Sequence, residues 1–151
     1  MRIVLDTNVF ISSFFGGNPR SIIDLWKDGR LTLCLSQDVI DEYIEVLGRL
    51  GLNNRPELEE LLKLCVTGFH IVFTTRTPEI HVVTDPDDDK FIACALALKA
   101  GYIVSGDKAL VDVRQYQGIK IVTPKEFLEI IRGSNPYPRS NAPKSARPSR
   151  C

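Results

Sequence analysis

The distribution of apolar and polar residues along the chain predicts strands that alternate with helices. Five short apolar runs, in which polar residues do not alternate, are typical of strands buried on both faces of a parallel sheet. These predicted strands cover residues 2–6, 31–35, 70–73, 102–105 and 119–122. Strands separated by helices indicate an α/β fold. We therefore expect a three-layer α/β/α domain with a central, mostly parallel sheet of about five strands.

The predicted helices fill the intervals between these strands. The main helical patterns cover residues 9–15, 19–28, 37–47, 56–67, 87–100 and 124–133. Ser36 and Thr123 are suitable N-cap residues for two of them. The stretch Phe91–Leu98 is apolar almost all round, which predicts a central, buried helix. The polar loop before it includes residues 79–83, which could pair briefly with a strand.

The length and composition of the chain are those of one domain with a sizeable core. Its 151 residues, of which 44% are hydrophobic, are ordinary for a globular protein. No apolar run reaches the roughly 20 residues that a membrane span needs, and the first residues do not resemble a signal peptide. The four cysteines form no Cys-x-x-Cys pair, which argues against a zinc site. We therefore expect a cytoplasmic protein that does not contact a membrane.

Charge is distributed unevenly, although the formal net charge is zero. Four of the 19 basic residues and none of the 19 acids lie in residues 134–151, so residues 1–133 carry 15 bases against 19 acids. The terminal segment also contains four Pro and four Ser, and we expect it to be a disordered tail beyond the domain of residues 1–133. The acidic body is more typical of acids clustered around a metal than of tight, non-specific binding to polyanions.

Acidic residues follow two of the predicted strands and open one predicted helix. Asp6 and Asp107 come directly after buried strands, and the carboxyl ends of parallel strands form the edge at which α/β folds build their sites. Asp87, Asp88 and Asp89 lie at the start of the buried helix, where the helix dipole stabilises a carboxylate.

A further pair of acids, Asp41 and Glu42, lies on the helix predicted for residues 37–47. Both flank its apolar stripe, so periodicity does not choose between them.

Several carboxylates at one edge of a sheet would repel one another unless a cation lies between them. Mg²⁺ favours carboxylate oxygens together with water and substrate phosphate. A metal held in this way lowers the pKa of bound water and stabilises charge on a phosphate. No His, Cys or Ser is placed to act as a nucleophile beside a base. The chemistry of the acids therefore predicts metal-assisted hydrolysis of phosphodiesters.

Four motifs taken together resemble those of the PIN-domain nucleases. They are Asp6-Thr7-Asn8 after an apolar strand, Ser36 with Glu42 six residues later, Asp89-Lys90-Phe91-Ile92-Ala93, and Ser105-Gly106-Asp107-Lys108. They occur in the correct order over roughly residues 1–130. The similarity is greatest to the branch named as toxins of toxin–antitoxin systems, in which a segment such as Asp85–Asp89 recurs.

The resemblance implies a Mg²⁺- or Mn²⁺-dependent endoribonuclease that cleaves RNA. The acids that bind the metal and carry out catalysis would be Asp6, Glu42, Asp89 and Asp107. The resemblance thus favours Glu42 over Asp41, and Asp89 over Asp87 or Asp88. It also implies that Asn8 and Ser105 hold the acids and the metal-bound water. It further implies an antitoxin protein as a partner, and a homodimer.

Other classes of protein remain as alternatives to a nuclease. Phosphatases with a strand-end Asp nucleophile carry a second Asp two residues later, where this chain has Asn8. A phosphoacceptor signalling domain also has an acidic pocket and a Lys, but it predicts labelling of one Asp and no RNA cleavage. A non-catalytic RNA-binding module could share the fold. The basic tail, residues 134–151, is either a solvated end or a salt-dependent contact for RNA phosphates.

Overall fold

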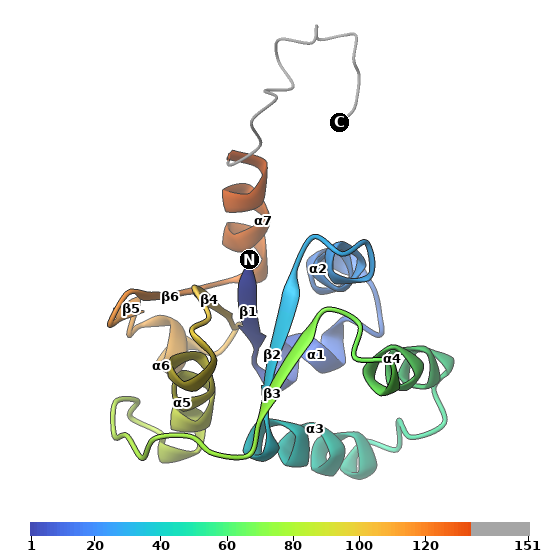
Figure 1. Ribbon diagram of the computed structural model, residues 1–151, viewed down its shortest axis with the longest axis horizontal. Coiled ribbons are helices and arrows are strands. Elements are labelled where there is room, and N and C mark those ends of the chain that lie inside the picture. Colours follow the sequence, from blue (N-terminus) through green and yellow to red (C-terminus); the bar gives the residue numbers. More distant parts are fainter. Residues whose placement is uncertain (134–151) are drawn as a thin grey trace, which may run out of the picture.

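A six-stranded sheet forms the centre of the protein (Figure 1). The computed structural model describes residues 1–133, and the tail predicted for residues 134–151 lies outside the described residues. The strands are β1 (Arg2–Leu5), β2 (Thr32–Ser36), β3 (Ile71–Thr74), β4 (Tyr102–Val104), β5 (Gln115–Tyr116) and β6 (Ile119–Val122). Their order in the sheet is β3-β2-β1-β4-β6-β5, and β5 alone runs antiparallel to its neighbour. The predicted α/β fold with a mostly parallel sheet is confirmed.

The strand β5 is the element of the sheet that the hydrophobic pattern did not predict. It is two residues long and pairs with β6 through Tyr116 and Ile119. Gln117 and Gly118 join the two strands and have φ angles of 49° and 85°, as tight hairpin turns require. A strand this short has no apolar pattern of its own. Residues 79–83, which could have paired with a strand, are irregular.

Helices cover both faces of the sheet. They are α1 (Thr7–Ser12), α2 (Gly17–Lys27), α3 (Gln37–Arg49), α4 (Pro56–Val66), α5 (Asp89–Leu98), α6 (Lys108–Val111) and α7 (Pro124–Gly133), and a 3₁₀ turn, η1 (Pro86–Asp88), directly precedes α5. Figure 1 shows α1, α2 and α4 on one side of the sheet and α5 and α6 on the other. The layers follow from right-handed crossovers that change side when the chain passes from β3 to β4. None of the helices in the described part of the chain is long and apolar enough to cross a membrane.

The predicted N-caps and the predicted buried helix are confirmed. The Ser36 hydroxyl accepts a hydrogen bond from the Val39 N–H at 3.2 Å, and the Thr123 hydroxyl accepts one from the Glu126 N–H at 3.1 Å. Helix α5 packs against β1, β2, β3 and β4, and its Ile92 side chain is fully buried. Helix α5 therefore covers the central strands of the sheet.

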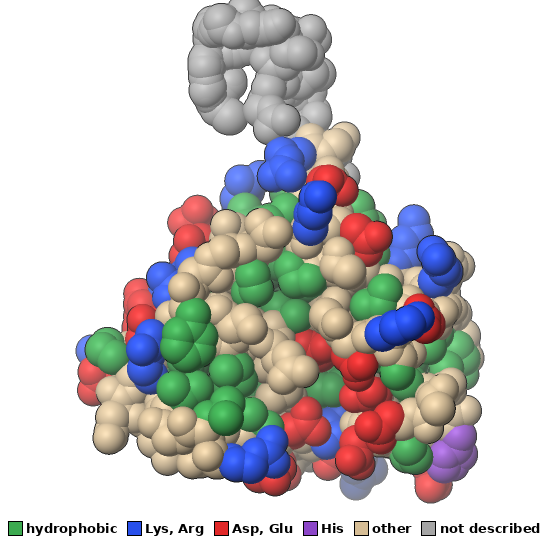
Figure 2. All heavy atoms as spheres, turned by 180° about the vertical axis from the view of Figure 1, so that it is seen from behind, with side chains coloured by type: hydrophobic (Ala, Val, Ile, Leu, Met, Phe, Trp, Pro, Cys, Tyr) green, Lys and Arg blue, Asp and Glu red, His purple; other side chains and the backbone are tan. Residues whose placement is uncertain are grey.

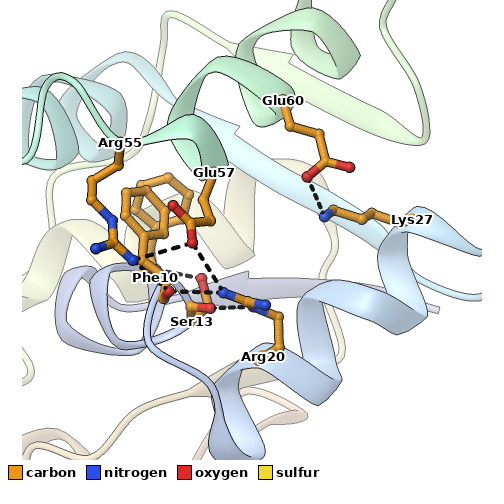
Figure 3. Close-up of polar contacts among 8 residues, drawn as sticks. Phe10, Ser13, Arg20, Lys27, Arg55, Glu57 and Glu60 are labelled. Carbon is orange, nitrogen blue, oxygen red and sulfur yellow. Dashed lines mark hydrogen bonds and ion pairs between the residues drawn. The ribbon is translucent and has the colours of Figure 1, made fainter.

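Two arginines anchor the C-terminal end of α1, as Figure 3 shows. Arg20 of α2 donates hydrogen bonds to the carbonyls of Ser13 and Phe14 at 2.6 and 2.7 Å. Arg55, at the start of α4, donates to the Phe14 carbonyl at 3.0 Å and to the Glu57 carboxylate at 3.1 Å. These bonds satisfy carbonyls that the end of a helix leaves free, and they tie α1 to α2 and α4.

The strand order reverses direction beside β1. Strands β2 and β3 follow β1 on one side, whereas β4 and β6 lie on the other side. The pairing of β1 with β4 places Leu5 opposite Val104. The residues that follow, Asp6 and Ser105, therefore leave the sheet side by side at this switch point, where open α/β sheets form their ligand crevice.

Candidate functional site

An open cavity of about 310 Å³ lies at the carboxyl edge of the sheet. Its lining residues are Asp6, Thr7, Asn8, Glu42, Glu45, Val46, Arg49, Asp87, Asp88, Phe91 and Asp107. Six of these eleven side chains are carboxylates, so the cavity is strongly acidic. Figure 2 shows acidic side chains gathered on the lower half of the face turned away in Figure 1.

Asp6 connects β1 to α1, and hydrogen bonds from its surroundings fix its position. Its backbone N–H donates to the Val104 carbonyl at 3.0 Å, and its Oδ1 accepts from the Val9 N–H at 2.8 Å as the N-cap of α1. The Ser105 hydroxyl donates to its Oδ2. Burial raises the pKa of Asp6 above its ordinary value, although the bonds from Ser105 and Val9 counteract part of this effect. Asp6 is thus a rigid, buried carboxylate in the wall of the cavity.

Ser105 connects Asp6 to Asp107. Its side-chain oxygen accepts a hydrogen bond from the Asp107 N–H at 2.9 Å while its hydroxyl donates to Asp6. The carboxylate of Asp107 accepts from the Ala109 N–H at 3.2 Å and so caps the short helix α6. Ser105 itself is fully buried. The structure therefore brings together three of the residues predicted for the site, two acids and the serine that holds them.

Of the adjacent acids Asp41 and Glu42, Glu42 lines the cavity, whereas Asp41 is exposed and accepts a hydrogen bond from Gln37 at 2.9 Å. The Thr7 hydroxyl donates to Glu42 Oε2, and Lys90 Nζ lies 2.6 Å from Glu42 Oε1. Glu42 is consequently oriented by the start of α1 and neutralised by the start of α5. The periodicity of α3 left this choice open, and the packing of α3 against α1 decides it.

Asp89 lies next to the cavity but does not line it. Its Oδ1 accepts hydrogen bonds from the backbone N–H groups of Val82 and Val83, at 3.0 and 2.8 Å, and its side chain is buried. In this position the carboxylate satisfies two amides of the irregular loop before α5. Of the four acids that the resemblance assigns to the site, the structure brings Asp6, Glu42 and Asp107 to the cavity and turns Asp89 towards the loop.

Asp88 occupies the position in the cavity that was expected for its neighbour. Its Oδ2 is buried and has no hydrogen-bond partner among residues 1–133. Burial, a hydrogen bond with Asp107 and the charges of Asp107, Asp85 and Asp6 raise the pKa of Asp88 to about 7. Nearby acids thus favour the protonated form of Asp88, and a bound cation would favour the ionised form.

The turn before α5 sets the direction of the Asp88 side chain, which the sequence named together with Asp87 and Asp89 but which the resemblance did not choose. Asp85 caps η1 by accepting from the Asp87 N–H at 3.0 Å, and Pro86 is the first residue of that turn. A 3₁₀ turn advances about 120° per residue, whereas an α-helix advances about 100°. Extending the α-helical pattern of α5 back to Asp88 therefore gives the wrong direction for the Asp88 side chain. The Asp-Pro pair was the available signal, because Pro favours the first position of a turn.

Asn8 and Arg49 complete the polar wall of the cavity. Asn8 is exposed and lies two residues after Asp6, the capping residue of α1, so that its amide is available to a ligand. Arg49 Nη1 lies 3.5 Å from Glu45 Oε2 on the same helix, and both side chains are largely exposed. The cavity thus combines a buried acidic end with an exposed, mixed end along α3.

The donor set of the buried end fits a hard divalent cation. The carboxylates of Asp6, Asp88 and Asp107 line this end of the cavity, and the unpartnered Asp88 Oδ2 is available as a ligand atom. Within residues 1–133, no three His, Cys, Asp or Glu side chains already lie close enough to ligate one ion together. Binding would therefore draw the acids inwards and displace the Asp88 proton.

Sequence comparison finds relatives for most of the chain. The family described as PIN domain matches residues 2–109, a region that includes every acid of the cavity. The chain is also 33% identical, over 147 residues, to an uncharacterized protein, MJ1680, of Methanocaldococcus jannaschii. That alignment covers 85% of this chain and 90% of the relative.

Proposed function

The chain belongs to the PIN domain family, and we propose that it is an endoribonuclease that hydrolyses RNA with Mg²⁺ or Mn²⁺. Proteins of this family are in general nucleases. The observation that carries the proposal is the unpartnered Asp88 Oδ2, which lies in the same cavity as the buried Asp6 and the partly buried Asp107. A cation would relieve the repulsion among these acids, and a phosphate would complete its coordination.

The residues that would hold the metal are Asp6, Asp107, Asp88 and Glu42. We assign the third acid to Asp88 rather than to Asp89, since Asp88 lines the cavity with an unpartnered Oδ2 whereas Asp89 lies outside the lining. Bound at the carboxylates, the metal would activate water and stabilise the charge of the leaving oxygen.

The remaining polar residues of the proposed site position the acids. Ser105 orients Asp6 by donating to its Oδ2, and Thr7 orients Glu42 by donating to its Oε2. Lys90 holds Glu42 in an ion pair, with its Nζ 2.6 Å from Glu42 Oε1. Asn8 is exposed at the mouth of the cavity and is suited to hold the attacking water or a phosphate oxygen.

The test is cleavage of a mixed-sequence single-stranded RNA with Mn²⁺ or Mg²⁺. Parallel reactions contain EDTA, or the variant Asp6→Asn. We expect cleavage that requires the metal and that is lost in Asp6→Asn. Cleavage that survives Asp6→Asn would come from a contaminant, and a folded chain that cleaves no RNA with either metal would contradict the proposal. A DNA strand of the same sequence tests whether the substrate is RNA in particular.

We further propose that the chain is the toxin of a toxin–antitoxin pair, restrained in the cytoplasm by an antitoxin protein. Besides the resemblance, a second cavity of about 270 Å³ between α3, α4 and β3 supports a protein partner. Its lining is almost entirely apolar, and Ile44, Leu62 and Phe73 at its rim are about half exposed or more. Surfaces of this kind are typical of protein interfaces. Arrest of growth on expression of the chain, relieved in Asp6→Asn, is the expected result.

A homodimer is the proposed state of the free chain. The mass of one chain is 16.9 kDa, so light scattering on a sizing column distinguishes one copy from two. A mass of about 17 kDa at micromolar concentration would contradict the dimer without affecting the proposed nuclease.

A further inference from the structure

One face of α3 extends the acidic cavity away from the buried acids. Glu42, Glu45, Val46 and Arg49 all line the cavity, and they are spaced at i, i+3, i+4 and i+7. Residues with this spacing form one row along a helix. Because a helix rises about 1.5 Å per residue, Arg49 begins about 10 Å beyond Glu42 along the helix axis. The cavity is therefore a trough, with the acids that would hold the metal at one end and an arginine at the other.

Arg49 is the one basic side chain among the residues that line this trough in the described chain. A strand of RNA that enters a cavity with six carboxylates is repelled unless a cation receives one of its phosphates. A metal at the buried end would offset the charge at the cleaved bond but not the charge of a flanking phosphate. At the other end of the trough, the positive charge of Arg49 can offset that of a flanking phosphate. A guanidinium binds a phosphate with two parallel hydrogen bonds.

The present partner of Arg49 holds it loosely. The distance from Arg49 Nη1 to Glu45 Oε2 is 3.5 Å, and the two side chains are 63% and 68% exposed. Exposed pairs on one helix contribute little to stability, so the guanidinium can exchange Glu45 for a phosphate at small cost. The other cation near the acids, Lys90, differs in this respect. It lies 2.6 Å from Glu42, and both side chains are less than a quarter exposed.

We propose that Arg49 forms a phosphate-binding subsite for the RNA strand at the end of α3, and that Glu45 opposes binding there by competing for the guanidinium. The subsite rests on the proposed ribonuclease function, because it places a flanking phosphate of the substrate. It gives the strand a direction, from the buried acids outwards along α3.

The test measures equilibrium binding of a fluorescein-labelled single-stranded RNA by anisotropy, in Mg²⁺, with the full chain carrying Asp6→Asn so that the RNA stays intact. Three further substitutions are made on this background: Arg49→Gln, Glu45→Gln and Arg30→Gln. Arg30 is exposed and precedes β2 at the opposite edge of the sheet, so Arg30→Gln removes the same charge away from the trough.

We expect Arg49→Gln to weaken binding about tenfold and to lower the slope of log K against log salt concentration by about 0.7, as the loss of one phosphate contact requires. Glu45→Gln should strengthen binding, and Arg30→Gln should change it less than twofold. Opposite effects of the two trough substitutions exclude a merely structural ion pair, for which both would act in the same direction.

Three results would overturn the subsite: unchanged affinity in Arg49→Gln, a loss of the same size in Arg30→Gln, or no RNA binding by any of these proteins. Cleavage by the chain with Asp6 intact reports the proposed nuclease separately, so a nuclease without the subsite is recognised as such.

Discussion

The Ser105 hydroxyl donates a hydrogen bond to Asp6 Oδ2, although the two residues are 99 positions apart in the chain. The register of β1 and β4 creates this contact, since Leu5 lies opposite Val104 and the next residue of each strand leaves the sheet beside the other. The bond fixes the rotamer of a buried carboxylate, and it leaves the Ser105 oxygen free to accept from the Asp107 N–H. A strand pairing thereby sets the geometry of the candidate site.

Replacing Ser105 with Ala should lower the rate of RNA cleavage by about tenfold, because Asp6 would be oriented less well. This loss corresponds to an increase of about 1.4 kcal/mol in the activation free energy. Asp6 would keep its Val9 bond but lose the donor to Oδ2, so the loss should be in kcat rather than in KM. Steady-state cleavage assays measure this split. The control is Ser12→Ala at an exposed position of α1, where no effect is expected. An unchanged kcat in Ser105→Ala would show that this bond does not position Asp6.

Asp88→Asn and Asp89→Asn are a matched pair of adjacent substitutions with different expected outcomes. Asp88→Asn should weaken Mn²⁺ binding by about tenfold or more, measured by calorimetry, because it removes a ligand from the cavity. Asp89→Asn should leave Mn²⁺ binding within a few-fold of the original.

Asp89→Asn should instead lower the free energy of unfolding by about 1–3 kcal/mol, because the N–H groups of Val82 and Val83 lose a charged acceptor. Hydrogen exchange of these two amides should become faster. The reverse pattern, in which Asp89→Asn abolishes metal binding and Asp88→Asn does not, would assign the ligand to Asp89.

The stability of the metal-free chain should depend on Asp88 between about pH 4 and pH 8. The pKa of Asp88 is raised from 3.8 to about 7 in the folded state. The folded state therefore binds the proton more tightly than the unfolded state does. This contribution to the free energy of unfolding is complete at a pH below 3.8, the ordinary pKa of Asp, and is lost as the pH rises through 7.

Asp88→Asn imitates the protonated carboxyl at every pH. In EDTA it should match the original chain at pH 4 and be more stable at pH 8, by about 1 kcal/mol once the screening of a partly exposed group is considered. Urea denaturation at the two pH values measures the difference. Equal stabilities at pH 8 would show that Asp88 is ionised without cost in the folded chain.

Arg20→Gln should destabilise the fold by about 1–3 kcal/mol, since it removes the donors to the carbonyls of Ser13 and Phe14. Lys27→Gln on the same helix is the control. Lys27 pairs with Glu60 at 2.8 Å through a partly exposed contact, and its loss should cost less than about 1 kcal/mol. Urea denaturation compares the two variants. Similar losses in both would mean that anchoring the end of α1 contributes no more than a surface ion pair.

Much of the fold could be predicted from local sequence, because it depends on local properties. The continuous apolar run of β1 predicted a strand buried on both faces, and the N-caps Ser36 and Thr123 marked the helices that follow. Elements with little local signal were not predicted, as β5 shows. Its two residues pair because of the turn at Gln117 and Gly118 and not because of an apolar pattern.

The sequence by itself determined that Asp6 and Asp107 lie at the carboxyl edge of a parallel sheet, because each follows a buried apolar strand. Only the tertiary structure decided which other acids join them. Contacts of α3 with α1 turn Glu42 rather than Asp41 to the cavity, and the 3₁₀ turn before α5 presents Asp88 there. The physical reason is that hydrophobic periodicity states which side of an element is buried. The direction of a polar side chain at the boundary depends on neighbours from distant parts of the chain.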